Sequence, residues 1–73
     1  MKTGIEIVKE WMTLATRLKR YNEKARLWVI LDLLEGIKPS KRLVDDALTW
    51  FTENVKDIPE KEIILKEIKK NET

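Results

Sequence analysis

The segment Leu27-Trp28-Val29-Ile30-Leu31-Asp32-Leu33-Leu34 decides the fold that this sequence predicts. Seven of its eight residues are apolar. As an α-helix it presents apolar side chains in every direction, and such a helix belongs in the middle of a fold. Asp32 is its one charged residue. We expect Asp32 on a narrow exposed edge rather than buried beside a base, because an unpaired buried carboxylate is costly.

The residues around this segment predict where its helix begins and ends. Asn22 is a favoured N-cap residue. Gly36 is able to adopt the positive φ that commonly follows the last turn of a helix. We therefore predict a helix over about 23–35, with a chain turn near residues 20–22.

One-sided helices are predicted before and after this central one. Thr3 and Glu6 have capping-box spacing, and the apolar residues that follow share one half of a helical wheel. Ser40 is the expected N-cap of a third helix, over about 41–54, which also has one apolar face. Asp57 and Glu60 mark the start of a weaker fourth helix over about 59–70.

The sequence thus predicts a single helical domain over residues 1–73, an all-α bundle of four short helices. The helix over 23–35 is central, its two neighbours flank it antiparallel, and the fourth is a loose cap. The three tryptophans, one in each of the first three helices, are expected to pack against one another. The expected core consists of Val8, Trp11, Ala15, Leu18, Leu27, Trp28, Ile30, Leu31, Leu34, Leu43, Ala47, Trp50, Phe51 and Ile64.

Composition limits the classes of function. With 73 residues the chain buries only a small core, so we expect a homodimer or docking to another subunit to complete the bundle, and we favour the homodimer. Cysteine and histidine are both absent, which removes disulfides and nearly all zinc, copper and haem ligation. We therefore expect no metal and no cofactor.

The charge is balanced, with 15 basic and 13 acidic residues and a net charge of +2. That balance does not by itself imply a nucleic-acid or membrane partner. No apolar run has the roughly 18 residues of a membrane-spanning helix, and the N-terminus does not resemble a signal peptide. We expect an intracellular, cytoplasmic protein without a membrane partner. Its enrichment in lysine and glutamate is typical of thermophile proteins.

Residue types for catalysis are scarce. A nucleophile–base pair of the usual type cannot be assembled from one serine, Ser40, and one tyrosine, Tyr21, without histidine or cysteine. Two carboxylate pairs remain, Asp32 with Glu35 and Asp45 with Asp46, and we interpret both as solvated helix surface. The sequence therefore predicts a protein that is not an enzyme.

Our first functional hypothesis is a small helical interaction module or accessory subunit. It would dock a helix face onto a protein partner or onto a second copy. The apolar half of the first helix is wider than one neighbouring helix covers, and tryptophan is a frequent hot spot of interfaces. The candidate interface consists of Ile7, Trp11, Leu14 and Leu18.

The alternative is a DNA-binding regulator that uses two basic segments. An up–down bundle places segment 17–26 beside the acidic segment 53–62, where the two are expected to neutralise each other. The second basic segment, 38–42, lies at the opposite end. The candidate nucleic-acid contacts are Arg17, Lys19, Arg20, Lys38, Ser40, Lys41 and Arg42.

A helix followed by Gly36-Ile37-Lys38-Pro39-Ser40 and a second helix resembles the latter part of the ribbon–helix–helix regulators. The resemblance implies a dimer in which a strand before the two helices reads the major groove of DNA. Arg17 and Lys19 would be outward residues of that strand, and Ser40 with Lys41 would hold phosphate. The two hypotheses differ over residues 10–20, which are helix in one and strand in the other.

Overall fold

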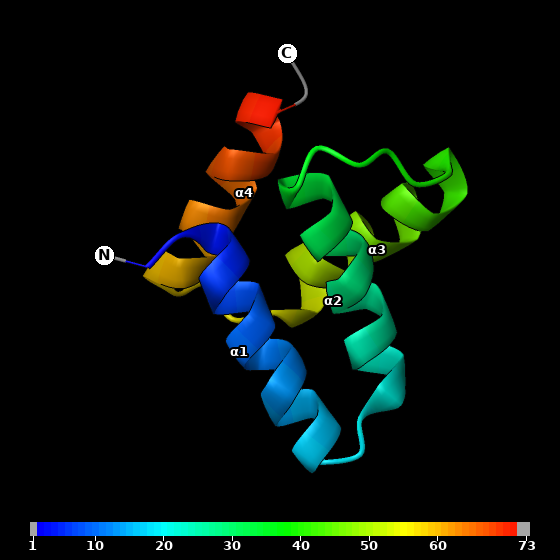
Figure 1. The fold of residues 1–73 in the computed structure, drawn as a ribbon, viewed down its shortest axis with the longest axis vertical. Coiled ribbons are helices and arrows are strands. Elements are labelled where there is room, and N and C mark those ends of the chain that lie inside the picture. Colours follow the sequence, from blue (N-terminus) through cyan, green and yellow to red (C-terminus); the bar gives the residue numbers. More distant parts are fainter. Residues whose placement is uncertain (1, 72–73) are drawn as a thin grey trace.

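The structure is a computed structural model that describes residues 2–71, and it has four α-helices and no strand within that range (Figure 1). They are α1 (Gly4–Arg17), α2 (Tyr21–Leu34), α3 (Lys41–Asn54) and α4 (Pro59–Asn71). The predicted all-α bundle is therefore confirmed. The bounds of α2, α3 and α4 lie within two residues of those predicted, whereas α1 ends at Arg17, before the expected turn.

The central position predicted for α2 is also confirmed, because α2 packs against each of the other three helices. In Figure 1, α1 and α2 run antiparallel from a tight turn at the bottom of the view, and α3 crosses behind α2. α4 packs against α1 and α2. No described helix is long and apolar enough to cross a membrane.

Local sequence explains most helix ends. Thr3 and Ser40 accept hydrogen bonds from the backbone N–H groups of Glu6 and Leu43, so both predicted N-caps are confirmed. After α2, Gly36 has a φ of 81°, its N–H donates to Leu33, and that of Ile37 donates to Asp32. This is a Schellman motif, as the glycine predicted.

The end of α1 has the same motif without a glycine. Lys19 has a φ of 57°, its N–H donates to the carbonyl of Thr16, and the N–H of Arg20 donates to that of Ala15. The motif reverses the chain before Asn22, which lies inside α2. The prediction of Asn22 as an N-cap is therefore wrong, because a non-glycine residue took the left-handed conformation.

The core confirms nine of the fourteen predicted residues as buried and adds Ile7, Met12 and Ile68. Trp11 and Trp50 are half-buried. Predictions of burial for Leu18, Trp28 and Leu43 are wrong, since each is more than half exposed. Trp28 is exposed because the other helices do not cover all sides of α2, so one side of the segment 27–34 faces solvent. Asp32 is half-buried.

α4 is not the loose cap that we expected, because its side chains bind the ends of all three other helices. Glu67 accepts a hydrogen bond from the N–H of Gly4, the first residue of α1. Asn71 donates to the carbonyls of Leu33 and Leu34 at the end of α2. The negative side chain of Glu67 thus lies at the N-terminus of α1, where the helix dipole favours a negative charge.

Lys61 makes the third of these contacts and is only 5% exposed. Its ammonium donates to the carbonyls of Thr52 and Val55, at the end of α3, at 2.9 and 2.8 Å, and to Asp57 at 3.0 Å. A cation at a helix C-terminus opposes the negative end of the dipole. Asp57, predicted as a cap, pairs with this lysine.

Candidate functional site

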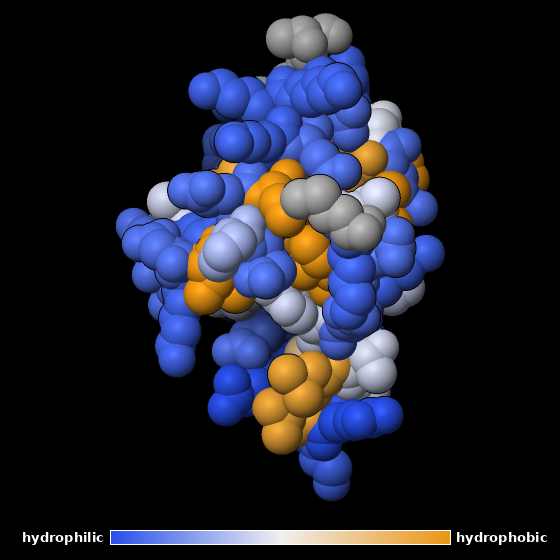
Figure 2. All heavy atoms as spheres, turned by 90° about the vertical axis from the view of Figure 1, so that its left-hand side faces the viewer, coloured by the Kyte–Doolittle hydropathy of each residue, from blue (hydrophilic) through white to orange (hydrophobic). Residues whose placement is uncertain are grey.

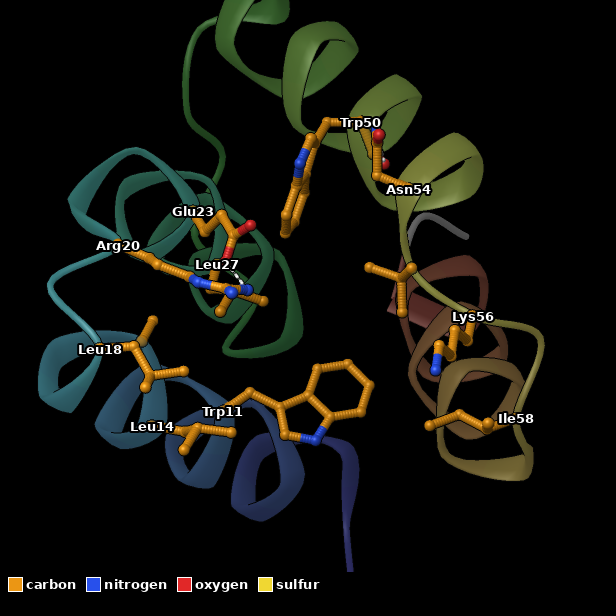
Figure 3. Close-up of a pocket in the computed structure, with 12 residues that line it drawn as sticks. Trp11, Leu14, Leu18, Arg20, Glu23, Leu27, Trp50, Asn54, Lys56 and Ile58 are labelled. Atoms are coloured by element: carbon orange, nitrogen blue, oxygen red, sulfur yellow. Dashed lines mark hydrogen bonds and ion pairs between the residues drawn. The ribbon is translucent and has the colours of Figure 1, made fainter.

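An apolar pocket of about 390 Å³ opens between α1, α2, α3 and the connection from α3 to α4, and we call it the tryptophan pocket (Figure 3). Trp11 from α1 and Trp50 from α3 point towards each other across it. Lys56 and Ile58, from the connection between α3 and α4, lie opposite Arg20 and Glu23. Its full lining is Trp11, Leu14, Ala15, Leu18, Arg20, Glu23, Leu27, Trp50, Asn54, Val55, Lys56 and Ile58.

Phe51 holds the two tryptophans of the pocket in place. It is fully buried, with ring centroids 6.2 Å from Trp11 and 6.4 Å from Trp50, both in tilted geometry. Arg26 lies over Trp50 at 5.9 Å and forms a salt bridge with Asp46 at 3.2 Å. The expected packing of three tryptophans is therefore corrected: two pack around Phe51, and Trp28 lies outside.

Two exposed leucines extend the apolar surface along α1. Leu14 is 53% exposed and Leu18 is 54% exposed, and their i,i+4 spacing places them on one face of the helix. Together with Trp11 they form a ridge over two turns, about 10 Å long at 1.5 Å per residue. Three of the four predicted interface residues therefore line the pocket.

Ile7, the fourth residue of the predicted interface, lies elsewhere. It is 3% exposed and belongs to the core. Its inclusion was wrong because α4 covers the first two turns of α1. The accessible part of the apolar face is the half of α1 that faces α3.

Figure 2 shows the side of the molecule formed by α1 and α4, with apolar side chains in separate patches among hydrophilic ones. No continuous apolar sheet covers this face. The tryptophan pocket, with the exposed Leu14 and Leu18 in its lining, is the apolar surface that we take as the candidate site.

Charged residues surround the pocket, and its acidic neighbours have partners of their own. Glu23 pairs with Arg20 at 3.7 Å. Glu10, one turn before Leu14, accepts a hydrogen bond from Lys2, and this contact raises the pKa of Lys2 above its usual value. These pairs differ from the neutralisation between segments 17–26 and 53–62 that we expected, since Arg20 and Arg26 bind Glu23 and Asp46.

Carboxylates form no metal-binding cluster in the described part of the chain. Within residues 2–71 there is no group of three or more acidic side chains placed to hold a metal ion. Asp46 is engaged by Arg26. The absence of a cofactor stays a prediction.

The candidate nucleic-acid contacts fall into two groups that the structure separates. Arg17, Lys19 and Arg20 lie at the turn before α2, whereas Lys38 to Arg42 follow its other end. A 14-residue helix spans about 21 Å at 1.5 Å per residue, so the groups do not merge. Residues 4–17 form α1, so the strand implied by the ribbon–helix–helix resemblance is not formed there.

Sequence reasoning missed the far wall of the pocket, from Asn54 to Ile58. Asn54 is the last residue of α3, and the residues after it lie between two helices, where periodicity gives no signal. Trp50 was assigned to the core, yet it also lines the pocket. Whether Trp50, near the end of α3, lies in the core or lines a pocket depends on how the connection to α4 packs against it.

Comparison with known proteins found no matching family model, no matching curated relative and no matching solved structure. The candidate site is therefore argued from its own residues, their exposure and their charges.

Proposed function

We propose that this chain is a non-enzymatic interaction module that docks a helix, from a protein partner or a second copy, onto the tryptophan pocket and the adjoining ridge. The observation that carries the proposal is the combination of two half-buried tryptophans with the exposed Leu14 and Leu18. Tryptophan is among the residue types enriched at the hot spots of protein interfaces.

Preorganisation supports this proposal. Phe51 and Arg26 both contact the ring of Trp50. Because the ring is already held in place, binding of a partner costs less side-chain entropy. Of the recurring modes of recognition, a surface formed by helices alone, as residues 2–71 provide, offers the helix-in-groove mode.

The test uses one double variant and one matched control. Leu14→Ala with Leu18→Ala removes the ridge, and Leu43→Ala removes a leucine of α3 that is 52% exposed and does not line the pocket. Sedimentation velocity at micromolar to hundreds of micromolar measures self-association. Selection of displayed amphipathic helical peptides on the immobilised protein measures docking of a partner.

We expect self-association or peptide binding, and we expect at least tenfold weakening in the double variant only. A chain that stays monomeric and selects no peptide sensitive to Leu14 and Leu18 would contradict the proposal.

A further inference from the structure

We infer that the occupant of the tryptophan pocket is an acidic amphipathic helix of another protein, and this rests on the function proposed above. Large apolar side chains of the partner helix would enter the pocket. The next turn of the partner helix would pack on the ridge of Trp11, Leu14 and Leu18. The ridge is about 10 Å long, which matches the distance between positions i and i+7 of a docked helix.

The charges around the pocket select the sign of the partner. Glu23 lines the pocket, Asp57 lies between the lining residues Lys56 and Ile58, and Glu10 precedes the lining residue Trp11. Each has a basic partner within this chain: Glu23 with Arg20, Asp57 with Lys61 and Glu10 with Lys2. Glu53 lines a separate hollow on α3 with Leu48, Thr49 and Thr52. The acidic charge near the pocket is therefore largely neutralised before any partner arrives.

The basic charge around the same pocket exceeds the acidic charge. Arg17 is three residues from Leu14 on α1 and thus flanks the ridge. Lys19 lies in the turn between two lining residues, Leu18 and Arg20, and Lys56 lines the opposite wall. All three are exposed. Acidic side chains on both edges of a docked apolar stripe would meet these bases.

The same charges argue against a second copy as the occupant. A twofold dimer places the same patch against itself, so Arg17, Lys19 and Lys56 of each copy would face one another. Like charges brought together across an interface oppose association.

The test uses two designed helical peptides with the same leucines at i, i+4 and i+7. One carries glutamates along both edges of this stripe, and the other carries lysines at those positions. The Trp28→Phe variant of the full chain leaves Trp11 and Trp50, which both line the pocket, as fluorescent reporters. We expect the glutamate peptide to bind about tenfold tighter, which two or three exposed charge pairs supply, and salt to reduce the difference.

A charge-reversal pair supplies the matched variants. Arg17→Glu with Lys56→Glu is expected to invert the preference between the peptides. Arg42→Glu with Lys66→Glu makes the same change in net charge at exposed positions that do not line the pocket, and is expected to preserve it.

Each remaining outcome overturns the inference in its own way. Equal binding of both peptides, sensitive to Leu14→Ala, rejects the acidic partner but keeps a helix-docking function. Failure of both peptides, with a dimer that Leu14→Ala disrupts, identifies a second copy as the occupant. If neither peptide binds, and the chain is a monomer both with and without Leu14→Ala, this inference and the proposed function are rejected together.

Discussion

The ammonium of Lys61, in the first turns of α4, lies 2.8 Å from the carbonyl oxygen of Val55, the residue that follows α3. The same group binds the carbonyl of Thr52, so one buried cation ties the start of α4 to the end of α3. A lysine is buried here because its donors are satisfied by these acceptors and by Asp57.

Lys61→Met should lower the free energy of unfolding by about 2 kcal/mol, because it keeps the apolar stem and leaves the carbonyls without their donor. Urea denaturation followed by circular dichroism measures the change. Lys56→Met, at an exposed lysine of the same connection, should stay within about 0.5 kcal/mol. Equal effects of the two substitutions would show that the ammonium does not stabilise α3.

Asp57→Asn separates the ion pair from the helix capping. The carboxylate is 97% exposed and therefore screened, so its removal should cost less than about 0.5 kcal/mol. The contribution of Lys61 is then attributed to the carbonyls. A loss from Asp57→Asn as large as that from Lys61→Met would refute this assignment.

Gly4 and Glu67 should be coupled. A Cβ at position 4 would lie 2.1 Å from Oε2 of Glu67, so Gly4→Ala displaces the carboxylate that caps α1. We expect Gly4→Ala to destabilise the protein by about 1 kcal/mol, and to be neutral or stabilising in a Glu67→Ala background, since alanine favours helix over glycine. A double-mutant cycle measures this coupling, and additive effects would exclude it.

The two Schellman motifs predict substitutions of opposite sign. Lys19 has a φ of 57°, so Lys19→Gly should relieve backbone strain and stabilise the protein by about 0.5–1 kcal/mol. Gly36→Ala should destabilise it by about 1 kcal/mol. Because no atom lies within 4 Å of a Cβ at Gly36, that loss reports the backbone alone. Thermal unfolding of both variants provides the comparison.

Substitution of the exposed Trp28 and of the buried Phe51 should have different effects on stability. Trp28→Phe should change stability by less than about 0.5 kcal/mol and shift the fluorescence maximum to shorter wavelength, because Trp28 is the most exposed of the three. Phe51→Leu should cost about 1–2 kcal/mol, because it loses both ring contacts. A red shift on removal of Trp28 would contradict its exposed position.

Duplex DNA should bind weakly. The two basic groups lie at opposite ends of α2, and residues 4–17 are helix, so no ribbon is present to enter the major groove. Anisotropy titration at low and moderate salt should show no saturable binding. Binding that weakens steeply with salt would restore the nucleic-acid hypothesis.

The sequence by itself determined the helices and most of the core. Helix periodicity, the caps at Thr3 and Ser40 and the glycine at position 36 are local properties, and each acts within a few residues. It also identified Trp11, Leu14 and Leu18 as a surface wider than one neighbour covers. These features can be predicted from the sequence because they depend on side chains that are close together in the chain.

Only the tertiary structure decided what covers that surface. It buried Ile7 under α4, exposed Trp28 and placed Trp50 opposite Trp11, because coverage depends on how helices distant in sequence cross. It also gave Lys61, Glu67 and Asn71 their roles at the ends of other helices, since a helix end shows its unpaired groups to whichever side chain folding brings there. The segment 27–34 is thus central to the fold, while the candidate site is made by the helices around it.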